Sequence, residues 1–196
     1  MLADFLTMGE SSGKEYRDLS YAFMGDLRFN MGRSLLVMGA LMGSDVRMVG
    51  PKKLAPPRDV VKVARDIAKE TGAKITITDD EAKGVKGVDF IHTDVWVSMG
   101  ESKDVWKSRV AMLKAFQVNA KLLKMTRNPD VKFMHCLPAF HDANTIVGAE
   151  MIKATGMTNG LEVTDEVFES PASIAFDQAE NRLHTIKAIM VATLGS

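Results

Sequence analysis

The chain has 196 residues, of which 46% are hydrophobic and 26% are charged, the balance of an ordinary globular protein. Its 25 basic and 25 acidic residues give a formal net charge of zero, which argues against nucleic acid or a membrane surface as a partner. No apolar run approaches the ~20 residues of a membrane span. The single cysteine, Cys136, excludes an internal disulfide, and Met1–Phe5 lacks the pattern of a signal peptide, so we expect a cytoplasmic location.

The predicted elements alternate between strands and helices. A short amphipathic helix carries Leu2, Phe5 and Leu6, and the polar stretch 9–14 after it is expected to be flexible. Apolar runs predict five strands, at residues 21–25, 46–49, 75–77, 88–91 and 132–135. Helices are predicted at about 30–42, 60–72 and 103–116, then from about 119 and finally from about 171.

This alternation indicates an α/β fold, a doubly wound, Rossmann-like parallel five-stranded sheet with helices on both faces. Right-handed crossovers favour the strand order 3-2-1-4-5. Both terminal helices lie outside the alternation. We therefore expect a linker helix and loop at 1–20, an α/β domain at 21–170, and a C-terminal helix at 171–196 that packs on a domain which this chain lacks.

Ligands of an open parallel sheet bind beyond the carboxyl ends of its strands, near the switch point between the first and fourth strands. The loops predicted there bring together an amide, a carboxylate, a hydroxyl and a thiol, namely Asn30, Asp94, Ser98 and Cys136. Each group also has a structural interpretation. The first two side chains are typical helix or turn caps, the serine is typical of a solvated loop, and the cysteine is typical of a small core residue.

Several other functions are disfavoured by the local sequence. The first predicted strand is not followed by G-x-G-x-x-G, and no P-loop is present, so a dinucleotide or nucleotide site is not expected. Asp26 and Arg28 are expected only to pair with each other at the surface. A metal at residues 135–136 and 141–142 is disfavoured because ligands within one short loop rarely close a tetrahedron. We expect neither a metal nor a cofactor.

Four segments, taken together, resemble ornithine carbamoyltransferases. They read F-M-G-D and N-M-G within 23–32, D-V-W-V-S-M-G-E at 94–101, H-C-L-P at 135–138, and E-N-R-L-H-T at 180–185. The resemblance covers residues 1 to about 194 and implies the second, ornithine-binding domain of that enzyme. It implies transfer of the carbamoyl group from carbamoyl phosphate to L-ornithine, giving L-citrulline and phosphate. It also implies a homo-oligomer, a trimer in complete family members.

The resemblance also implies roles for individual residues in holding ornithine. Asn30 and the backbone at Met99 would bind the substrate carboxylate, and Asp94 and Ser98 would bind the α-amino group. Phe29 departs from the pattern, because many members carry a second asparagine at this position.

The carbamoyl phosphate site is represented only in part. The resemblance implies that Cys136 and Leu137 lie where the two substrates meet, that Arg182 reaches carbamoyl phosphate, and that Cys136 and Asp94 are the catalytic residues. The S-T-R-T and H-P-T-Q motifs that bind carbamoyl phosphate in the family's first domain do not occur in this sequence. We therefore expect a truncated or standalone ornithine-binding half, inactive by itself. A non-catalytic amino-acid-binding module and a carbamoyltransferase for another amine, such as putrescine, are the alternatives.

Overall fold

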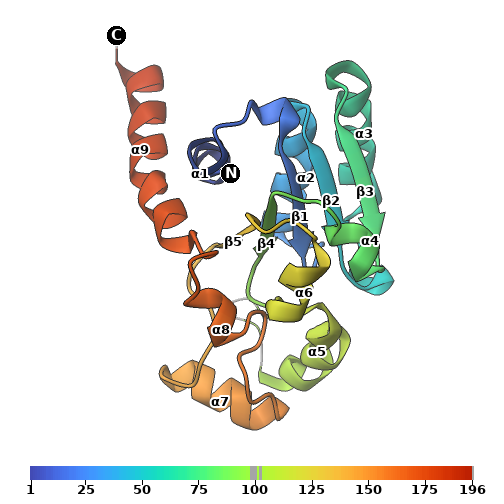
Figure 1. The fold of residues 1–196 in the computed structure, drawn as a ribbon, viewed down its shortest axis with the longest axis vertical. Helices are drawn as coiled ribbons and strands as arrows, with labels where there is room; N and C mark the ends of the chain where they lie inside the picture. The colour runs from blue at the N-terminus through green and yellow to red at the C-terminus, as the bar shows by residue number, and fades with distance from the viewer. Residues whose placement is uncertain (98–100, 102, 196) are drawn as a thin grey trace.

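The computed structural model describes residues 1–97, 101 and 103–195. Parallel strands form one sheet in the order β3-β2-β1-β4-β5, which confirms the predicted order (Figure 1). The strands are β1 (Ser20–Met24), β2 (Asp45–Val49), β3 (Lys74–Thr78), β4 (Phe90–Thr93) and β5 (Lys132–His135). Tyr21 pairs with Val46 and with Phe90, and Phe90 pairs with Lys132, so the carboxyl ends of the strands share one edge.

Helices cover both faces of the sheet, and alternate side chains of each strand enter opposite cores. Tyr21 and Phe23 of β1 belong to the core on one face, and Ala22 and Met24 belong to the core on the other. The helices that contribute to the first core are α1 (Leu2–Ser12), α2 (Asn30–Met42) and α3 (Arg58–Thr71). Those that contribute to the second are α4 (Glu81–Val85), α6 (Ala120–Met125), α8 (Asp165–Phe168) and the start of α9 (Ala175–Leu194). The predicted doubly wound architecture is confirmed.

A third, smaller core lies beyond the carboxyl edge of the sheet. Trp96 and Leu161 meet there with residues of α5 (Trp106–Leu113) and α7 (Ile146–Thr155). Figure 1 shows α5, α7 and α8 gathered below the strands. This core supports the segment that follows β4, one of the segments expected to bind the ligand.

The prediction that residues 9–14 are flexible is wrong for residues 9–12. The helix α1 continues to Ser12, whose hydroxyl donates a hydrogen bond to the carbonyl of Met8 at 2.7 Å. It ends at Gly13, which adopts the left-handed conformation, with φ of 65°. Phe5 and Met8 are buried, so the apolar side of α1 packs within this chain.

Several other boundaries differ from the prediction, three of them in ways that have a clear physical reason. The fourth strand begins two residues late, at Phe90, because Val88 closes a turn onto Val85. The single helix expected at 103–116 is divided into 3-10 turns on either side of α5. The last helix, α9 (Ala175–Leu194), begins four residues after Pro171, because residues 170–173 form a turn that pairs with β5.

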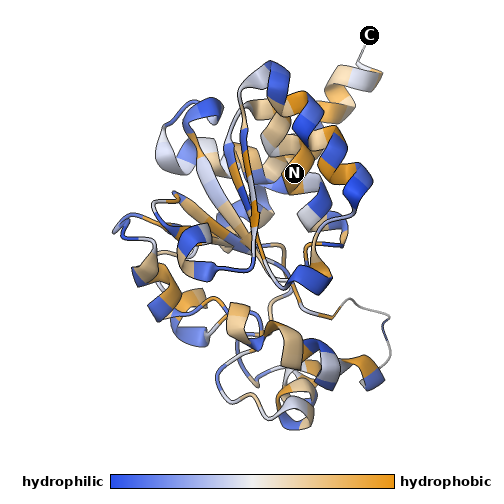
Figure 2. Cartoon of the chain, turned by 90° about the vertical axis from the view of Figure 1, so that its right-hand side faces the viewer, coloured by the Kyte–Doolittle hydropathy of each residue, from blue (hydrophilic) through white to orange (hydrophobic). Residues whose placement is uncertain are grey.

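The helix α9 is buried at its start and exposed along the remainder. Ala175, Gln178 and Asn181 are buried, whereas Leu183 and Val191 are 68% and 62% exposed. Figure 2 shows hydrophobic residues continuing along this helix towards the C-terminus. None of the helices in the described part of the chain is both long and apolar enough to span a membrane.

Candidate functional site

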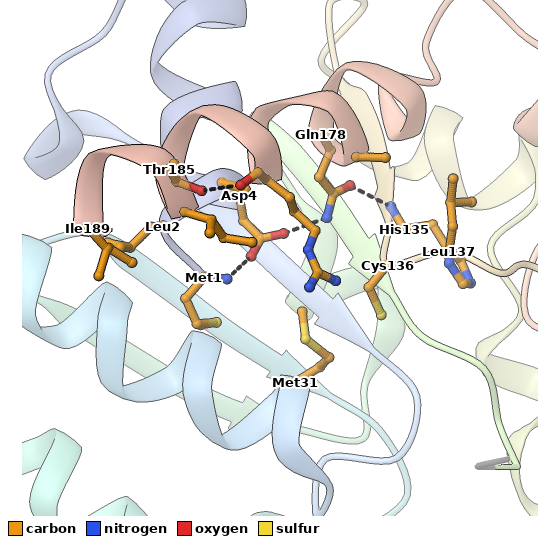
Figure 3. Close-up of a pocket in the computed structure, with 14 residues that line it drawn as sticks. Met1, Leu2, Asp4, Met31, His135, Cys136, Leu137, Gln178, Thr185 and Ile189 are labelled. Carbon is orange, nitrogen blue, oxygen red and sulfur yellow. Dashed lines mark hydrogen bonds and ion pairs between the residues drawn. The ribbon is translucent and has the colours of Figure 1, made fainter. Parts of the chain in front are cut away.

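A pocket of about 400 Å³ lies at the carboxyl edge of the sheet, between the end of β5, α1, the start of α2, and α9. Cys136 and Leu137 line it after β5, Met31 lines it from α2, and Arg182 and Ile186 line it from α9. Figure 3 shows Cys136 and Met31 towards one end of the pocket and the α9 residue Ile189 towards the other. Its volume is typical of sites for small molecules.

Parallel pairing brings Asp94 next to Cys136. Thr93 of β4 pairs with His135 of β5, so the residues that follow them, Asp94 and Cys136, leave the sheet at the same edge. Burial raises the pKa of the Cys136 thiol, and the negative charge of Asp94 and a hydrogen bond to it raise this pKa further. The thiol is therefore protonated at neutral pH and donates to the carboxylate, which makes it a poor nucleophile. Asp94 also accepts the backbone N–H of Val95 at 2.7 Å.

This contact predicts that Cys136 reacts slowly with iodoacetamide at pH 8, and that Asp94→Asn makes it react several-fold faster. Removing the carboxylate charge lowers the pKa of the thiol, and only the thiolate is alkylated. Mass spectrometry over a pH series measures the rates, with the unfolded chain as reference. The control is Asp130→Asn, which changes an exposed aspartate and is expected to leave the rate unaltered. Equal rates in Asp94→Asn and the parent would contradict the contact.

Asn30 lies at the start of α2 and is exposed. Its interpretation as a helix cap is wrong, because Phe29 occupies the N-cap position and no side chain caps the helix. Unpaired N–H groups and the helix dipole at this end favour a carboxylate ligand. The next residue, Met31, lines the pocket. Ser98 and Met99 lie outside the described residues, so their roles stay predictions.

Arg182 is exposed on α9 and lines the same pocket as Cys136 and Leu137. Within the part of the chain that the structure describes, no carboxylate forms an ion pair with Arg182. A guanidinium in such a position suits a phosphate group, whose oxygens match its donors. The structure therefore brings together the three residues expected to meet carbamoyl phosphate, while their role in binding it stays a prediction.

A buried polar network, which the sequence did not predict, joins α1, β4, β5 and α9. The Asp4 carboxylate lies 3.3 Å from Nε2 of His92 and 2.5 Å from the amine of Met1, and it accepts a hydrogen bond from the amide of Gln178 (Figure 3). Gln178 in turn accepts the backbone N–H of His135 at 2.9 Å. The network fixes α9, and therefore Arg182, against the strand that precedes Cys136.

The charge state of this network follows from its contacts. Burial alone would raise the pKa of Asp4, but the hydrogen bond and charge of His92, together with the Met1 amine, hold the pKa well below its usual range. Asp4 is therefore ionised inside the protein. The signal that could have identified it is a lone carboxylate between the apolar residues Ala3 and Phe5 of the first helix.

A second buried cluster corrects the expected surface pair of Asp26 and Arg28. Asp26 is only 6% exposed, and it binds Arg28 and also Arg109, which is 8% exposed. Sequence analysis missed Arg109, because nothing in the spacing of residues 103–116 distinguishes it from the other basic residues of that stretch.

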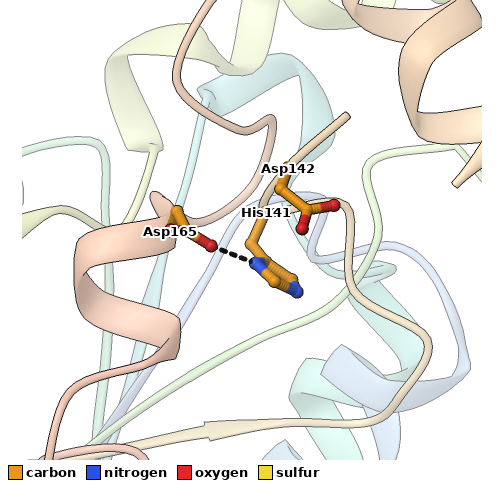
Figure 4. Close-up of side chains that lie close together, drawn as sticks. All are labelled: His141, Asp142 and Asp165. Carbon is orange, nitrogen blue, oxygen red and sulfur yellow. Dashed lines mark hydrogen bonds and ion pairs between the residues drawn. The ribbon is translucent and has the colours of Figure 1, made fainter. Parts of the chain in front are cut away.

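The group nearest to a metal site consists of His141, Asp142 and Asp165 (Figure 4). Nδ1 of His141 lies 2.7 Å from Asp165, and its ring stacks on Phe168 at 3.9 Å between centroids. Asp142 accepts from the backbone and side chain of Asn144. These contacts account for the positions of the three side chains within the fold.

The chain was then compared with known proteins. The family model of the aspartate/ornithine carbamoyltransferase Asp/Orn binding domain matches residues 17–193. A catabolic ornithine carbamoyltransferase of Pseudomonas putida is 58% identical over 195 residues, and one of Rhizobium meliloti is 56% identical over 195 residues. These alignments cover 99% and 100% of this chain, but in each case 58% of the relative. The chain thus spans less than two thirds of the curated relatives it matches.

Solved structures of ornithine carbamoyltransferases also superpose on this chain. The ornithine carbamoyltransferase of Pyrococcus furiosus superposes with a TM-score of 0.83 at 36% identity, covering 99% of this chain and 55% of the other. The anabolic enzyme of Campylobacter jejuni superposes with a TM-score of 0.82 at 29% identity, covering 99% and 57%.

Proposed function

Because this chain belongs to the aspartate/ornithine carbamoyltransferase family, we propose that it is the ornithine-binding domain of an ornithine carbamoyltransferase. The reaction would be attack of the ornithine side-chain amine on the carbamoyl carbon, with release of phosphate and formation of citrulline. The observation that carries this proposal is the Asp94–Cys136 contact beside the pocket lined by Leu137 and Arg182.

Each charged group at the α-amino acid end of ornithine has a complementary group in this chain. The zwitterionic end of ornithine presents an ammonium group for Asp94 and a carboxylate for Asn30 and the start of α2. A charge-assisted contact contributes about 1.5–3 kcal/mol, and a dissociation constant of 1 mM corresponds to about 4.1 kcal/mol. Two such contacts therefore support millimolar binding of ornithine by this chain.

The chemical step requires a neutral amine and two aligned substrates, and this chain provides only part of the groups needed. The attacking amine has a reference pKa near ~10.4, so its neutral form costs about 4.6 kcal/mol at pH 7. Nearby cationic groups such as Arg182 favour the neutral amine, and the protonated Cys136 thiol and Asp94 orient it. Alignment of two bound substrates is worth roughly 7–11 kcal/mol. The family's S-T-R-T and H-P-T-Q motifs, which would hold the second substrate, do not occur in this sequence.

We therefore expect the 196-residue chain to bind ornithine with a dissociation constant on the order of 1 mM and to form no citrulline. Titration monitored by ¹H–¹⁵N NMR measures the binding, and a colorimetric citrulline assay with carbamoyl phosphate measures turnover. Robust citrulline formation by this chain would refute the expected inactivity. No shift of the Asp94 or Val95 amides up to 50 mM ornithine, roughly fifty times that constant, would refute ornithine binding.

Two further experiments distinguish this function from the two alternatives. Putrescine lacks the α-amino acid end that Asn30 and Asp94 would hold, so it should not displace ornithine; displacement at equal concentration would favour a different acceptor amine. A non-catalytic amino-acid-binding module is the second alternative. Joining this chain to the remaining part of the Pseudomonas putida relative distinguishes it, because citrulline then forms only if the catalytic groups are functional.

A further inference from the structure

Two segments that carry proposed ornithine ligands leave the sheet side by side. Met24 at the end of β1 pairs with Thr93 at the end of β4, so the segment 25–30, which ends in Asn30, starts next to the segment that starts with Asp94. Residues 25–29 of the first segment and 94–97 of the second lie outside the sheet ladder. The distance between these two ligands therefore depends on contacts made outside the sheet.

Arg109 of α5 makes contacts with both segments. Its Nη1 lies 3.0 Å from the Asp26 carboxylate in the first segment and 3.1 Å from the Trp96 carbonyl in the second. Its Nη2 lies 2.9 Å from the carboxylate of Glu101, seven residues after Asp94. One buried guanidinium thus joins three acceptors from two segments that are about 70 residues apart in the sequence.

Phe29 adds a fourth contact, next to Asn30. The guanidinium carbon of Arg109 lies 5.3 Å from the centre of the Phe29 ring, and that of Arg28 lies 5.5 Å from it. Both distances are typical of cation–π contacts. The residue that departs from the family pattern is therefore used in packing against arginines.

Opposite charges meet in this cluster. Two carboxylates, of Asp26 and Glu101, meet two guanidinium groups, of Arg28 and Arg109. Buried charges are tolerated when each is paired with an opposite charge in this way. Removing one partner leaves the other charge buried and unpaired, which is destabilising. Lysine cannot replace Arg109, because an ammonium group lacks the planar fork that reaches several acceptors at once.

We propose that Arg109 is a positioning residue that sets the distance between Asn30 and Asp94, and so the affinity for ornithine. This inference rests on the function proposed above. Arg109 acts through Asp26, Phe29, Trp96 and Glu101 and does not itself contact the substrate.

The test compares Arg109→Lys with a matched control, Arg47→Lys, in the 196-residue chain. Arg47 also binds a carboxylate, that of Asp45, and a carbonyl, that of Lys86, but it contacts neither ligand segment. One set of NMR spectra gives two readouts. These are the dissociation constant for ornithine and the hydrogen-exchange rate of the buried indole N–H of Trp96, whose resonance a Trp106→Phe variant assigns.

Arg109→Lys is expected to raise both the dissociation constant and the Trp96 exchange rate at least tenfold, while Arg47→Lys changes each less than twofold. Parent-like values of either quantity in Arg109→Lys would overturn the positioning role. If Arg109→Lys does not fold, Glu101→Gln removes the negative charge that faces Nη2 of Arg109 and must shift both readouts in the same direction. A parent chain that binds no ornithine would contradict the proposed function, and the exchange rates alone would then decide the role of Arg109.

Discussion

Replacing Asp4 by alanine is expected to lower the free energy of unfolding by about 3–5 kcal/mol, as in other buried charge pairs that lose one partner. The truncation removes the buried acceptor that Nε2 of His92 and the amide of Gln178 share, and leaves these two nitrogens 3.0 Å from each other. The cost of unsatisfied donors adds to the loss of the pair itself. Urea denaturation followed by circular dichroism at pH 7 measures the change.

The loss of unfolding free energy in Asp4→Ala is also expected to depend on pH. Because the folded protein holds the pKa of Asp4 below its usual range, the stability it contributes is present above the unfolded value of ~3.9 and is lost as the pH falls below it. The difference in the free energy of unfolding between parent and Asp4→Ala should therefore stay constant down to about pH 5 and narrow progressively as the pH falls below about 4. Asp130→Ala serves as the control, since its side chain is exposed and its removal should change stability by less than about 0.5 kcal/mol. A constant difference across the pH range would contradict an ionised Asp4.

Replacing Asp94 by asparagine is expected to weaken ornithine binding by roughly 10- to 150-fold, the equivalent of one charge-assisted contact of about 1.5–3 kcal/mol. The amide has nearly the shape of the carboxylate, so the fold and the pocket are retained while the negative charge that attracts the ammonium group is lost. NMR titration at pH 7 measures the change. Asp165→Asn is the matched control, because it removes an exposed carboxylate that pairs with His141 on another part of the surface. Unchanged affinity in Asp94→Asn would remove Asp94 from the proposed site.

Much of the fold could be predicted because the sheet has a clear sequence pattern. Five short apolar runs separated by helical spacing specify parallel strands, and crossover handedness then specifies their order. The helices α4 and α8 were missed because they have only five and four residues. The helix α7 was missed because it begins with Ile146 and Val147, which are exposed and blur the division between a polar and an apolar face.

The contact between Asp94 and Cys136 could also be predicted, since parallel pairing places the residues that follow β4 and β5 at one edge. The contacts of Asp4 and Arg109 that support this site could not be predicted. Asp4 meets Gln178 across 174 residues, and Arg109 meets Asp26 across 83 residues. Both depend on how helices outside the sheet ladder dock, and no local pattern encodes that docking.

The pairing of α1 with α9 has a consequence for the order of folding. A ribosome adds about 5–20 residues each second, so α9 is synthesised roughly ten seconds or more after α1. Until then Asp4 has neither Gln178 nor His92 beside it within a finished core, and water must solvate it. Closing so long a loop is entropically costly and slow. The helix α1 is therefore among the last elements of this chain to reach its native surroundings.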